Sequence, residues 1–140
     1  MNILVAADGS PYTKRMLAYL AAHDEWLGAS HNYTVMTAVM ALPARAAAVL
    51  GSATVKAYYH DEAEKVFKPI RAFFARQGIT AAFVGKAGQA AELIARQAEA
   101  GKFDLLLMGS HGHGNLTNMV LGSVVTNVLA RCKTPLLLVR

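Results

Sequence analysis

The 140-residue sequence has one cysteine, four prolines and one tryptophan, and charged residues make up only 16% of it. The single cysteine, Cys132, excludes an intrachain disulfide and fits a reducing compartment, where it serves as a small hydrophobe near a helix end. No apolar run approaches the roughly 18 residues of a membrane span, and no charged segment precedes an apolar one at the start. We therefore expect a soluble, cytoplasmic protein without a membrane segment.

Basic clusters and internal repeats are also missing. The net charge is +5, but lysines and arginines are scattered, and no basic run is interleaved with aromatic residues. This pattern does not predict a nucleic-acid groove. It leaves two interpretations, an anionic small-molecule partner or a solvated basic surface. Without a repeat, a linker or a low-complexity tract, the length predicts a single domain over 1–140.

Apolar and β-branched runs alternate with helical patterns along the whole chain. The runs predict five strands, at 2–7, 33–40, 79–84, 104–108 and 135–139. Between them, helical patterns cover 12–27, 56–77, 89–100 and 123–131. This alternation predicts an α/β fold, a three-layer open doubly wound sheet of five parallel strands with helices on both faces.

Three local features refine this prediction. Ser10 is expected to cap the first helix, with Pro11 at its first position. Pro69 is expected to kink or divide the second helix, because it lacks an N–H and clashes with the preceding turn. Segment 41–55 contains Pro43 and Gly51 and is interpreted as a loop with at most a short helical turn, of the kind that often covers a binding site.

The stretch GSHGHGNLTNMVLGSV, residues 109–124, follows the fourth predicted strand. Its glycines permit positive φ and close backbone approach, and successive N–H groups there can form an anion nest. Gly122 and Ser123 then open a helix whose free N–H groups suit a phosphate. Ser123 has an ordinary alternative as an N-cap residue. The stretch is therefore a candidate nucleotide site, metal site or turn.

Other motifs narrow these alternatives. Asp8 follows the first strand and is either a ribose, adenine or metal-water contact or a turn residue. His111 and His113 are too few for a closed metal site, so they are expected beside phosphates or in solvent, and no metal ligand is assigned. The chain has no Walker-type phosphate loop, and Asp8-Gly9-Ser10 does not supply the dinucleotide-binding fingerprint.

The glycine spacing carries a specific resemblance. Gly109, two residues, Gly112, nine residues and Gly122-Ser123 resemble the G-2x-G-9x-G-S/T pattern of the ATP-binding subset of the universal stress protein family. NILVAADGS resembles that family's first strand and turn, and CKTPLLLV its last strand. The resemblance spans the chain and implies the strand order 3-2-1-4-5.

The resemblance also implies a ligand, its contacts and an assembly. Asp8 and Val39 are expected near the ribose and the adenine. The full set of implied nucleotide contacts is Ala6, Asp8, Val39, Met108, Gly109, Gly112, His113, Gly114, Gly122, Ser123 and Val124. The ligand is ATP, and whether Mg²⁺ or Mn²⁺ accompanies it stays open. The family resemblance further implies a homodimer through the last strand, Pro135 to Val139, an apolar edge unless it is paired or covered by helices.

These features predict an ATP-binding stress-response or signalling module that acts as a homodimer and reports to an unknown protein partner. No catalytic residue is assigned, because no carboxylate in the loop orients water and no arginine follows the phosphate glycines. The alternatives are a nucleotide-free interaction module of the same fold and a slow ATP hydrolase. An enzyme that cleaves ATP at the α-phosphate is disfavoured, because the turn after the first strand is poor in glycine.

Overall fold

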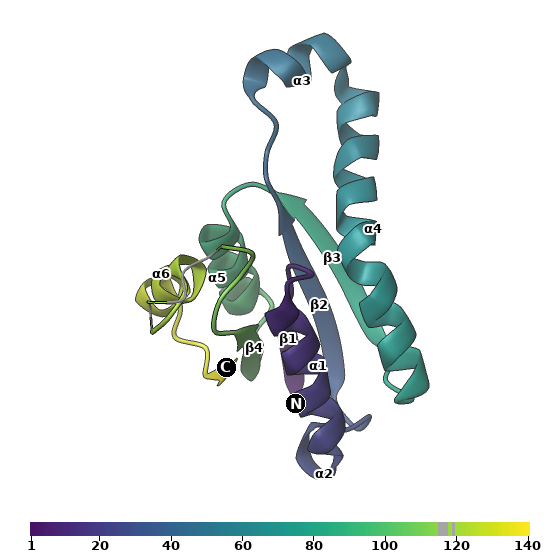
Figure 1. The fold of residues 1–140 in the computed structure, drawn as a ribbon, viewed down its shortest axis with the longest axis vertical. Helices are drawn as coiled ribbons and strands as arrows, with labels where there is room; N and C mark the ends of the chain where they lie inside the picture. The colour runs from purple at the N-terminus through teal and green to yellow at the C-terminus, as the bar shows by residue number, and fades with distance from the viewer. Residues whose placement is uncertain (115–117, 119) are drawn as a thin grey trace.

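A computed structural model describes residues 1–114, 118 and 120–140, so residues 115–117 and 119 of the glycine-rich stretch lie outside the described residues. Five parallel strands form one sheet in the order β3-β2-β1-β4-β5 (Figure 1). The strands are β1 (Asn2–Ala6), β2 (Asn32–Val39), β3 (Ala81–Ala87), β4 (Leu105–Gly109) and β5 (Leu136–Val139). The helices are α1 (Pro11–Ala22), α2 (Asp24–Leu27), α3 (Ala44–Leu50), α4 (Ser52–Arg76), α5 (Ala90–Ala100) and α6 (Ser123–Arg131). Within the described residues, no helix is both long enough and apolar enough to cross a membrane.

Helices cover both faces of the sheet, which confirms the predicted fold class and strand order. On one face, α1 and α4 pack over a buried cluster that includes Val5, Val35 and Leu107. On the other face, α5 and α6 pack over a second cluster that includes Leu4 and Leu106. The central strands are buried on both sides, and this explains why their sequences are continuous apolar runs.

The winding of the chain reverses between β1 and β4. These two strands are neighbours in the sheet, with Ala6 beside Met108 at their carboxyl ends. The chain from β1 goes on to α1, while the chain from β4 enters the glycine-rich stretch and α6 on the opposite face. Ligands of open parallel sheets bind in the crevice at such a point. The structure therefore places Asp8 and the described ends of the glycine-rich stretch, residues 109–114 and 120–124, at the carboxyl ends of the strands.

The first predicted helix, 12–27, is divided into α1 and α2 at His23. Its backbone leaves the helical region there, with φ −127° and ψ 43°. The imidazole Nδ1 lies 2.9 Å from the carbonyl oxygen of Tyr19, and its ring stacks on the Tyr19 ring at 4.0 Å. The His23 carbonyl accepts N–H bonds from Trp26 and Leu27, so it starts a new helical turn.

Segment 41–55, interpreted as a loop, is helical over most of its length. Ala44–Leu50 forms α3 and α4 begins at Ser52, because alanine has the highest intrinsic helix propensity. Gly51 joins the two helices with a φ of 82°, a conformation that favours glycine. The prediction of a loop was wrong because the alanines outweigh Pro43, which only precedes α3.

Pro69 neither ends nor divides α4, which is assigned as one helix over 25 residues. Pro69 is exposed, so the Lys65 carbonyl that loses its N–H partner is on the solvent side of the helix, where water can replace it. Strand β3 is also shifted relative to the predicted 79–84. The Ile79 N–H bonds to the Phe74 carbonyl and closes the end of α4, so the strand begins only at Ala81.

Tyr33 connects the sheet to the end of α2 and gives the fold a defined response to alkaline pH. Its buried hydroxyl donates to the Leu27 carbonyl and lies 3.2 Å from the Gly28 carbonyl oxygen. Burial raises the pKa of Tyr33 to about 12. An unfolded tyrosine titrates near pH 10. The neutral Tyr33 hydroxyl therefore contributes its full stabilisation of the folded state below about pH 10, and this contribution is lost as the pH rises toward 12.

We expect Tyr33→Phe to lower the free energy of unfolding at pH 7 by about 1–2 kcal/mol, since the buried Leu27 carbonyl loses its donor. The gap between wild type and variant should narrow between pH 10 and 12. Urea unfolding across this pH range measures both effects, and Tyr58→Phe, at an exposed position, is the matched control. A gap that stays constant up to pH 12 would contradict the role given to Tyr33.

Candidate functional site

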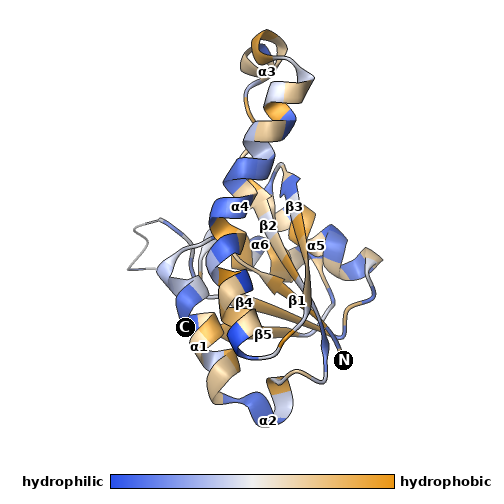
Figure 2. Cartoon of the chain, turned by 90° about the vertical axis from the view of Figure 1, so that its right-hand side faces the viewer, coloured by the Kyte–Doolittle hydropathy of each residue, from blue (hydrophilic) through white to orange (hydrophobic). Residues whose placement is uncertain are grey.

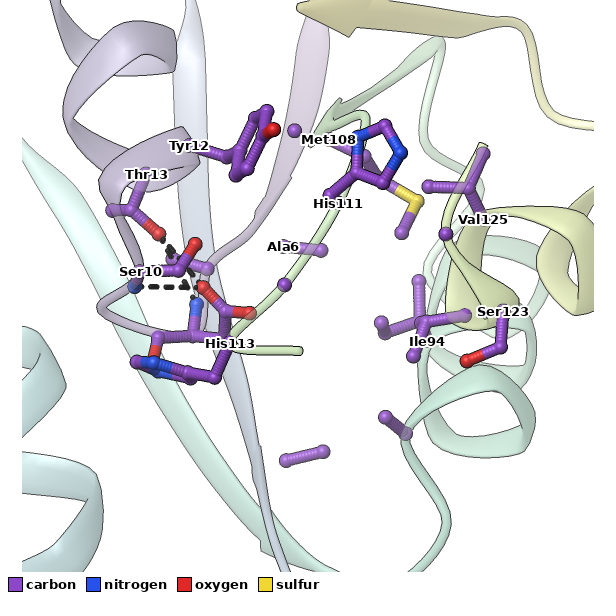
Figure 3. A pocket seen from close by; sticks show the side chains of 18 of the residues that line it. Ala6, Ser10, Tyr12, Thr13, Ile94, Met108, His111, His113, Ser123 and Val125 are labelled. Carbon is purple, nitrogen blue, oxygen red and sulfur yellow. Dashed lines mark hydrogen bonds between the residues drawn. The ribbon is translucent and has the colours of Figure 1, made fainter. Parts of the chain in front are cut away.

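A cavity of about 310 Å³ opens at the carboxyl ends of β1 and β4, between the turn after β1 and the start of α6 (Figure 3). Its volume lies at the lower end of the range of small-molecule sites, about 300–1,000 Å³. The lining residues are Ala6, Ala7, Asp8, Ser10, Tyr12, Thr13, Met36, Ala38, Ala90, Ile94, Met108, Gly109, His111, Gly112, His113, Gly114, Gly122, Ser123, Val124 and Val125. Most of the wall is apolar, and polar groups lie at two ends of it, the β1 turn and the α6 start.

Asp8 organises the turn after β1 through one of its carboxylate oxygens. Oδ1 accepts the Ser10 N–H at 2.9 Å and the Thr13 hydroxyl at 3.2 Å. The Thr13 oxygen in turn accepts the N–H groups of Asp8 and Gly9, and Gly9 adopts a φ of 76°. The second oxygen, Oδ2, has no hydrogen bond among those described and lies against Gly112, where an added Cβ would come within 2.7 Å of it. Asp8 can therefore hold the turn and bind a ligand at the same time.

Ser10 occupies the N-cap position of α1, but its side chain does not cap the helix. The residue is fully buried, and its hydroxyl has no hydrogen-bond partner among the described residues. Leaving a buried hydroxyl unsatisfied costs about 1–3 kcal/mol. The predicted side-chain cap is therefore wrong, because the Thr13 N–H that a capping hydroxyl would accept donates instead to the Ser10 main-chain carbonyl at 3.0 Å. Ser10 borders the cavity, so a ligand reaches its hydroxyl once the atoms that cover it are displaced.

The glycines allow three chain segments to approach within contact distance. A Cβ at Gly112 would lie 2.7 Å from Asp8 Oδ2, and one at Gly109 would lie 2.6 Å from the Cβ of Tyr12. At Gly122, a Cβ would lie 3.1 Å from the Ser110 carbonyl oxygen. The Gly122 N–H also donates to that carbonyl at 2.8 Å. Gly122 thereby packs the start of α6 against the segment that leaves β4.

The start of α6 contributes backbone donors to the cavity. Gly122 is the N-cap residue and Ser123 the first helical residue, and among the described residues no side chain caps the helix. The first-turn N–H groups have no partner within their own helix, and the helix dipole adds a partial positive charge there. Ser123 is exposed at the cavity rim, and its N-cap alternative does not hold because Gly122 occupies that position. This end of α6 is suited to an anion.

Two histidines and no lysine or arginine line the described part of the cavity. His113 Nε2 lies 2.6 Å from the Asp8 carbonyl oxygen, so the imidazole bridges the glycine-rich stretch and the β1 turn. His111 pairs through Nδ1 with the Ser110 hydroxyl at 2.9 Å and lies beside the Tyr12 ring. An anion in this cavity would be held by backbone N–H groups and imidazoles rather than by a strong cation.

The model of the universal stress protein family matches residues 1–140 of the chain. The chain belongs to this family. Among curated relatives, universal stress protein Slr1230 from Synechocystis is 43% identical over 53 residues, 38% of this chain and 18% of its own length. The Methanocaldococcus jannaschii protein MJ0577 is 43% identical over 49 residues, 35% of this chain and 30% of its own length. The chain thus matches less than a third of the length of either relative.

Solved structures of the family share the fold over nearly the whole chain. The structure of MJ0577 has a TM-score of 0.74 at 23% identity and covers 99% of this chain and 94% of its own. The UspA protein of Lactobacillus plantarum has a TM-score of 0.75 at 18% identity, with 100% and 97% coverage. A universal stress protein family protein from Arabidopsis thaliana, solved with AMP bound, has a TM-score of 0.68 at 11% identity, with 99% and 90% coverage.

In this universal stress protein, ten of the eleven residues predicted to contact a nucleotide line this cavity. The exception is Val39. Side chains alternate along β2, so Met36 and Ala38 point into the cavity, while Val39 faces the α4 side and lines a second cavity. Sequence reasoning missed Ser10, although a serine directly after Asp8-Gly9 is a signal that could have indicated it.

The cavity also sets limits on metal binding. Among the described residues, no group of three His, Cys, Asp or Glu side chains could hold an ion. Asp8 carries the single carboxylate in the described lining. Mg²⁺ is commonly bound by one or two carboxylates together with substrate phosphates. Asp8 Oδ2 therefore fits a cation that arrives with a phosphorylated ligand, but not a resident protein-only metal centre.

Proposed function

We propose that this protein binds ATP in the cavity between β1, β4 and α6 and acts as a nucleotide-dependent module of a stress response. The observation that carries the proposal is the buried, unpartnered Ser10 hydroxyl, which lines the same cavity as the uncapped start of α6. A nucleotide that fills the cavity would give each group a polar partner, with its phosphates at the α6 start and another of its polar groups at Ser10. Two structural relatives support a nucleotide ligand, since one was solved with AMP and another with cAMP, the latter at a TM-score of 0.64.

The position of each end of the nucleotide follows from charge. The α6 start and the glycine backbone favour the phosphates, which carry the negative charge. Asp8 would repel a phosphate at close range, so its free Oδ2 suits a ribose hydroxyl or a phosphate-bound cation. The apolar wall of Met36, Ala38 and Ile94 suits the base.

We further propose that ATP is a bound signal rather than a rapidly consumed substrate. Phosphoryl transfer requires stabilisation of charge on the transferred group, which enzymes supply with lysine, arginine and metal ions. The described lining offers two histidines and one carboxylate, and that carboxylate is held by Ser10 and Thr13. ATP would then stabilise the folded, ligand-bound state.

Calorimetric titration with ATP, ADP and AMP tests the proposal, after bound nucleotide has been removed by denaturation and the protein refolded. Phosphate release is followed in parallel. Saturable ATP binding without multiple turnover is the expected result. Rapid turnover would show an ATP hydrolase. No binding at millimolar ATP would favour an interaction module that does not use nucleotide.

The assembly we propose is a homodimer through β5, at the edge of the sheet. β4 bonds to alternate residues of β5, with the Leu106 N–H on Pro135 and the Ser110 N–H on Val139. The backbone groups of the intervening residues, Leu136 and Leu138, therefore point away from the sheet. Such an unpaired apolar edge favours pairing with a second copy.

Ser10→Ala is expected to separate ligand binding from fold stability. Without nucleotide, the variant should unfold at the same temperature as wild type or higher, because an unsatisfied buried hydroxyl is removed. Its ATP affinity should fall about 2- to 12-fold, the equivalent of one hydrogen bond worth about 0.5–1.5 kcal/mol. Thermal unfolding with and without ATP measures both, with Ser52→Ala as an exposed control. A variant less stable without ligand would instead assign the hydroxyl a partner inside the protein.

A further inference from the structure

The glycine-rich stretch, residues 109–124, contains two histidines and no lysine, arginine, aspartate or glutamate. The strands that lead to this end of the sheet, β1 and β4, have no charged side chain and are coloured mostly hydrophobic in Figure 2. Helix α6 has no charged side chain before Arg131 in its last turn. His111 and His113 are therefore the side chains of the stretch that can carry a positive charge, and histidine changes its charge between about pH 5 and 8.

His111 lies where the segment that leaves β4 meets the start of α6. A Cβ added at Gly122, the N-cap residue of α6, would lie 3.2 Å from the His111 Cα. The His111 side chain is half-buried and lines the cavity (Figure 3). His111 therefore lies beside the backbone donors of α6, which are suited to the phosphates of a nucleotide.

The contacts that hold the His111 ring are compatible with both of its charge states. Nδ1 lies 2.9 Å from the hydroxyl oxygen of Ser110, a buried residue. A hydroxyl can donate to a neutral Nδ1 and can accept from a protonated one. The ring also lies beside Tyr12, with 5.1 Å between the two ring centroids. Tyr12 packs against Gly109, and the Arg15 guanidinium lies 4.8 Å from its ring centroid. Protonation therefore changes the charge of His111 while these contacts remain.

The second histidine, His113, is less suited to bind phosphate through its charge. Its Nε2 lies 2.6 Å from the carbonyl oxygen of Asp8, whose carboxylate would offset the charge of an imidazolium. On the described elements around the His111 ring, the charged or titratable side chains are Asp8 and His113 at the cavity, Tyr12 and Arg15 on α1, and Arg140 directly after β5. Of these residue types, histidine is the one that ordinarily changes charge near neutral pH.

We propose that His111 makes ATP binding sensitive to pH, because its protonated ring adds a positive charge beside the phosphates and its neutral ring does not. The inference rests on the proposed ATP site and adds a regulator to it. By linkage, bound ATP in turn favours the protonated ring, so binding takes up protons. The fraction of nucleotide-bound protein then rises as the pH falls, and the protein responds to ATP and to acidity at one site.

Calorimetric titration with ATP between pH 6 and pH 8.5 tests the proposal in wild type and in His111→Asn. Asparagine keeps a polar group that can bond to the Ser110 hydroxyl but carries no charge. The terminal phosphate of ATP also titrates near neutral pH, and the ratio of the two dissociation constants, variant over wild type, cancels this effect. We expect this ratio to rise about 3- to 10-fold from pH 8.5 to pH 6, as one added charge near the phosphates predicts.

A second measurement needs no variant. In wild-type protein, the titration of the His111 ring protons is followed by NMR with and without ATP. Bound ATP should move this titration to higher pH, because the phosphates favour the protonated ring. A titration that does not move on ATP binding would overturn the proposal.

His60→Asn, at an exposed position on α4, is the matched control and should follow wild type at every pH. Urea unfolding at pH 6 and pH 8.5 compares the stabilities of the variants. A ratio that stays constant with pH, while ATP still binds, would overturn the role of His111 and leave the ATP site in place. A pH effect that is removed by His113→Asn instead would overturn the choice of histidine. Absence of ATP binding at every pH would overturn the proposed function together with this inference.

Discussion

Gly122→Val is expected to raise the dissociation constant for ATP at least about 100-fold, equivalent to about 2.7 kcal/mol of binding free energy. Gly122 holds the start of α6 against the segment that leaves β4, with its N–H on the Ser110 carbonyl at 2.8 Å. A Cβ there would lie 3.1 Å from that oxygen and 3.2 Å from the His111 Cα. The valine methyl groups must therefore push apart two walls of the cavity.

Gly122→Ala provides a graded comparison, because a single methyl group demands a displacement of only a few tenths of an ångström. We expect it to weaken ATP binding less than valine does. Calorimetry gives the affinities, and urea unfolding without nucleotide shows whether both variants remain folded. Wild-type affinity in a folded Gly122→Val protein would place the nucleotide outside this cavity.

The sheet could be predicted from sequence because its central strands are buried on both faces. The run from Leu105 to Met108 is apolar without alternation, which is typical of a parallel strand covered by helices. The strand order was implied by the family resemblance, and the β1–β4 register confirms the reversal of winding that brings Asp8 to the glycine-rich stretch. Local chemistry and one motif were therefore sufficient to position most of the site.

Apart from α3, which follows from its alanines, the features that were missed depend on particular side-chain contacts or on a register of one residue. The break at His23 arises from its contacts with Tyr19, which no propensity scale contains. Val39 and Ala38 are adjacent, yet a strand directs them to opposite faces. The Ser10 hydroxyl is unpartnered because the Thr13 N–H donates to the Ser10 main-chain carbonyl instead, and that competition is visible only in three dimensions.

Asp8→Asn is expected to have the second large effect and to raise the dissociation constant for ATP about 12- to 160-fold. This factor is equivalent to the about 1.5–3 kcal/mol contributed by a hydrogen bond to a charged group. The asparagine oxygen can replace Oδ1 and still accept from Ser10 and Thr13, which preserves the turn. Its amide nitrogen then occupies the place of Oδ2, where it offers a donor instead of an acceptor. A ribose hydroxyl or a cation loses its acceptor.

Asp8→Ala separates the two functions of this side chain. It removes both oxygens, so it should also lower the free energy of unfolding by about 1–3 kcal/mol, whereas Asp8→Asn should change it little. Titrations with Mg²⁺ and with a chelator distinguish the partner of Oδ2. If the loss of ATP affinity in Asp8→Asn disappears when a chelator is present, the partner of Oδ2 is a phosphate-bound cation. If the loss of affinity persists, the partner is the ribose. Tighter ATP binding in Asp8→Asn would place a phosphate beside Asp8 and reverse the orientation of the nucleotide proposed here, because removing the negative charge relieves repulsion only at a phosphate.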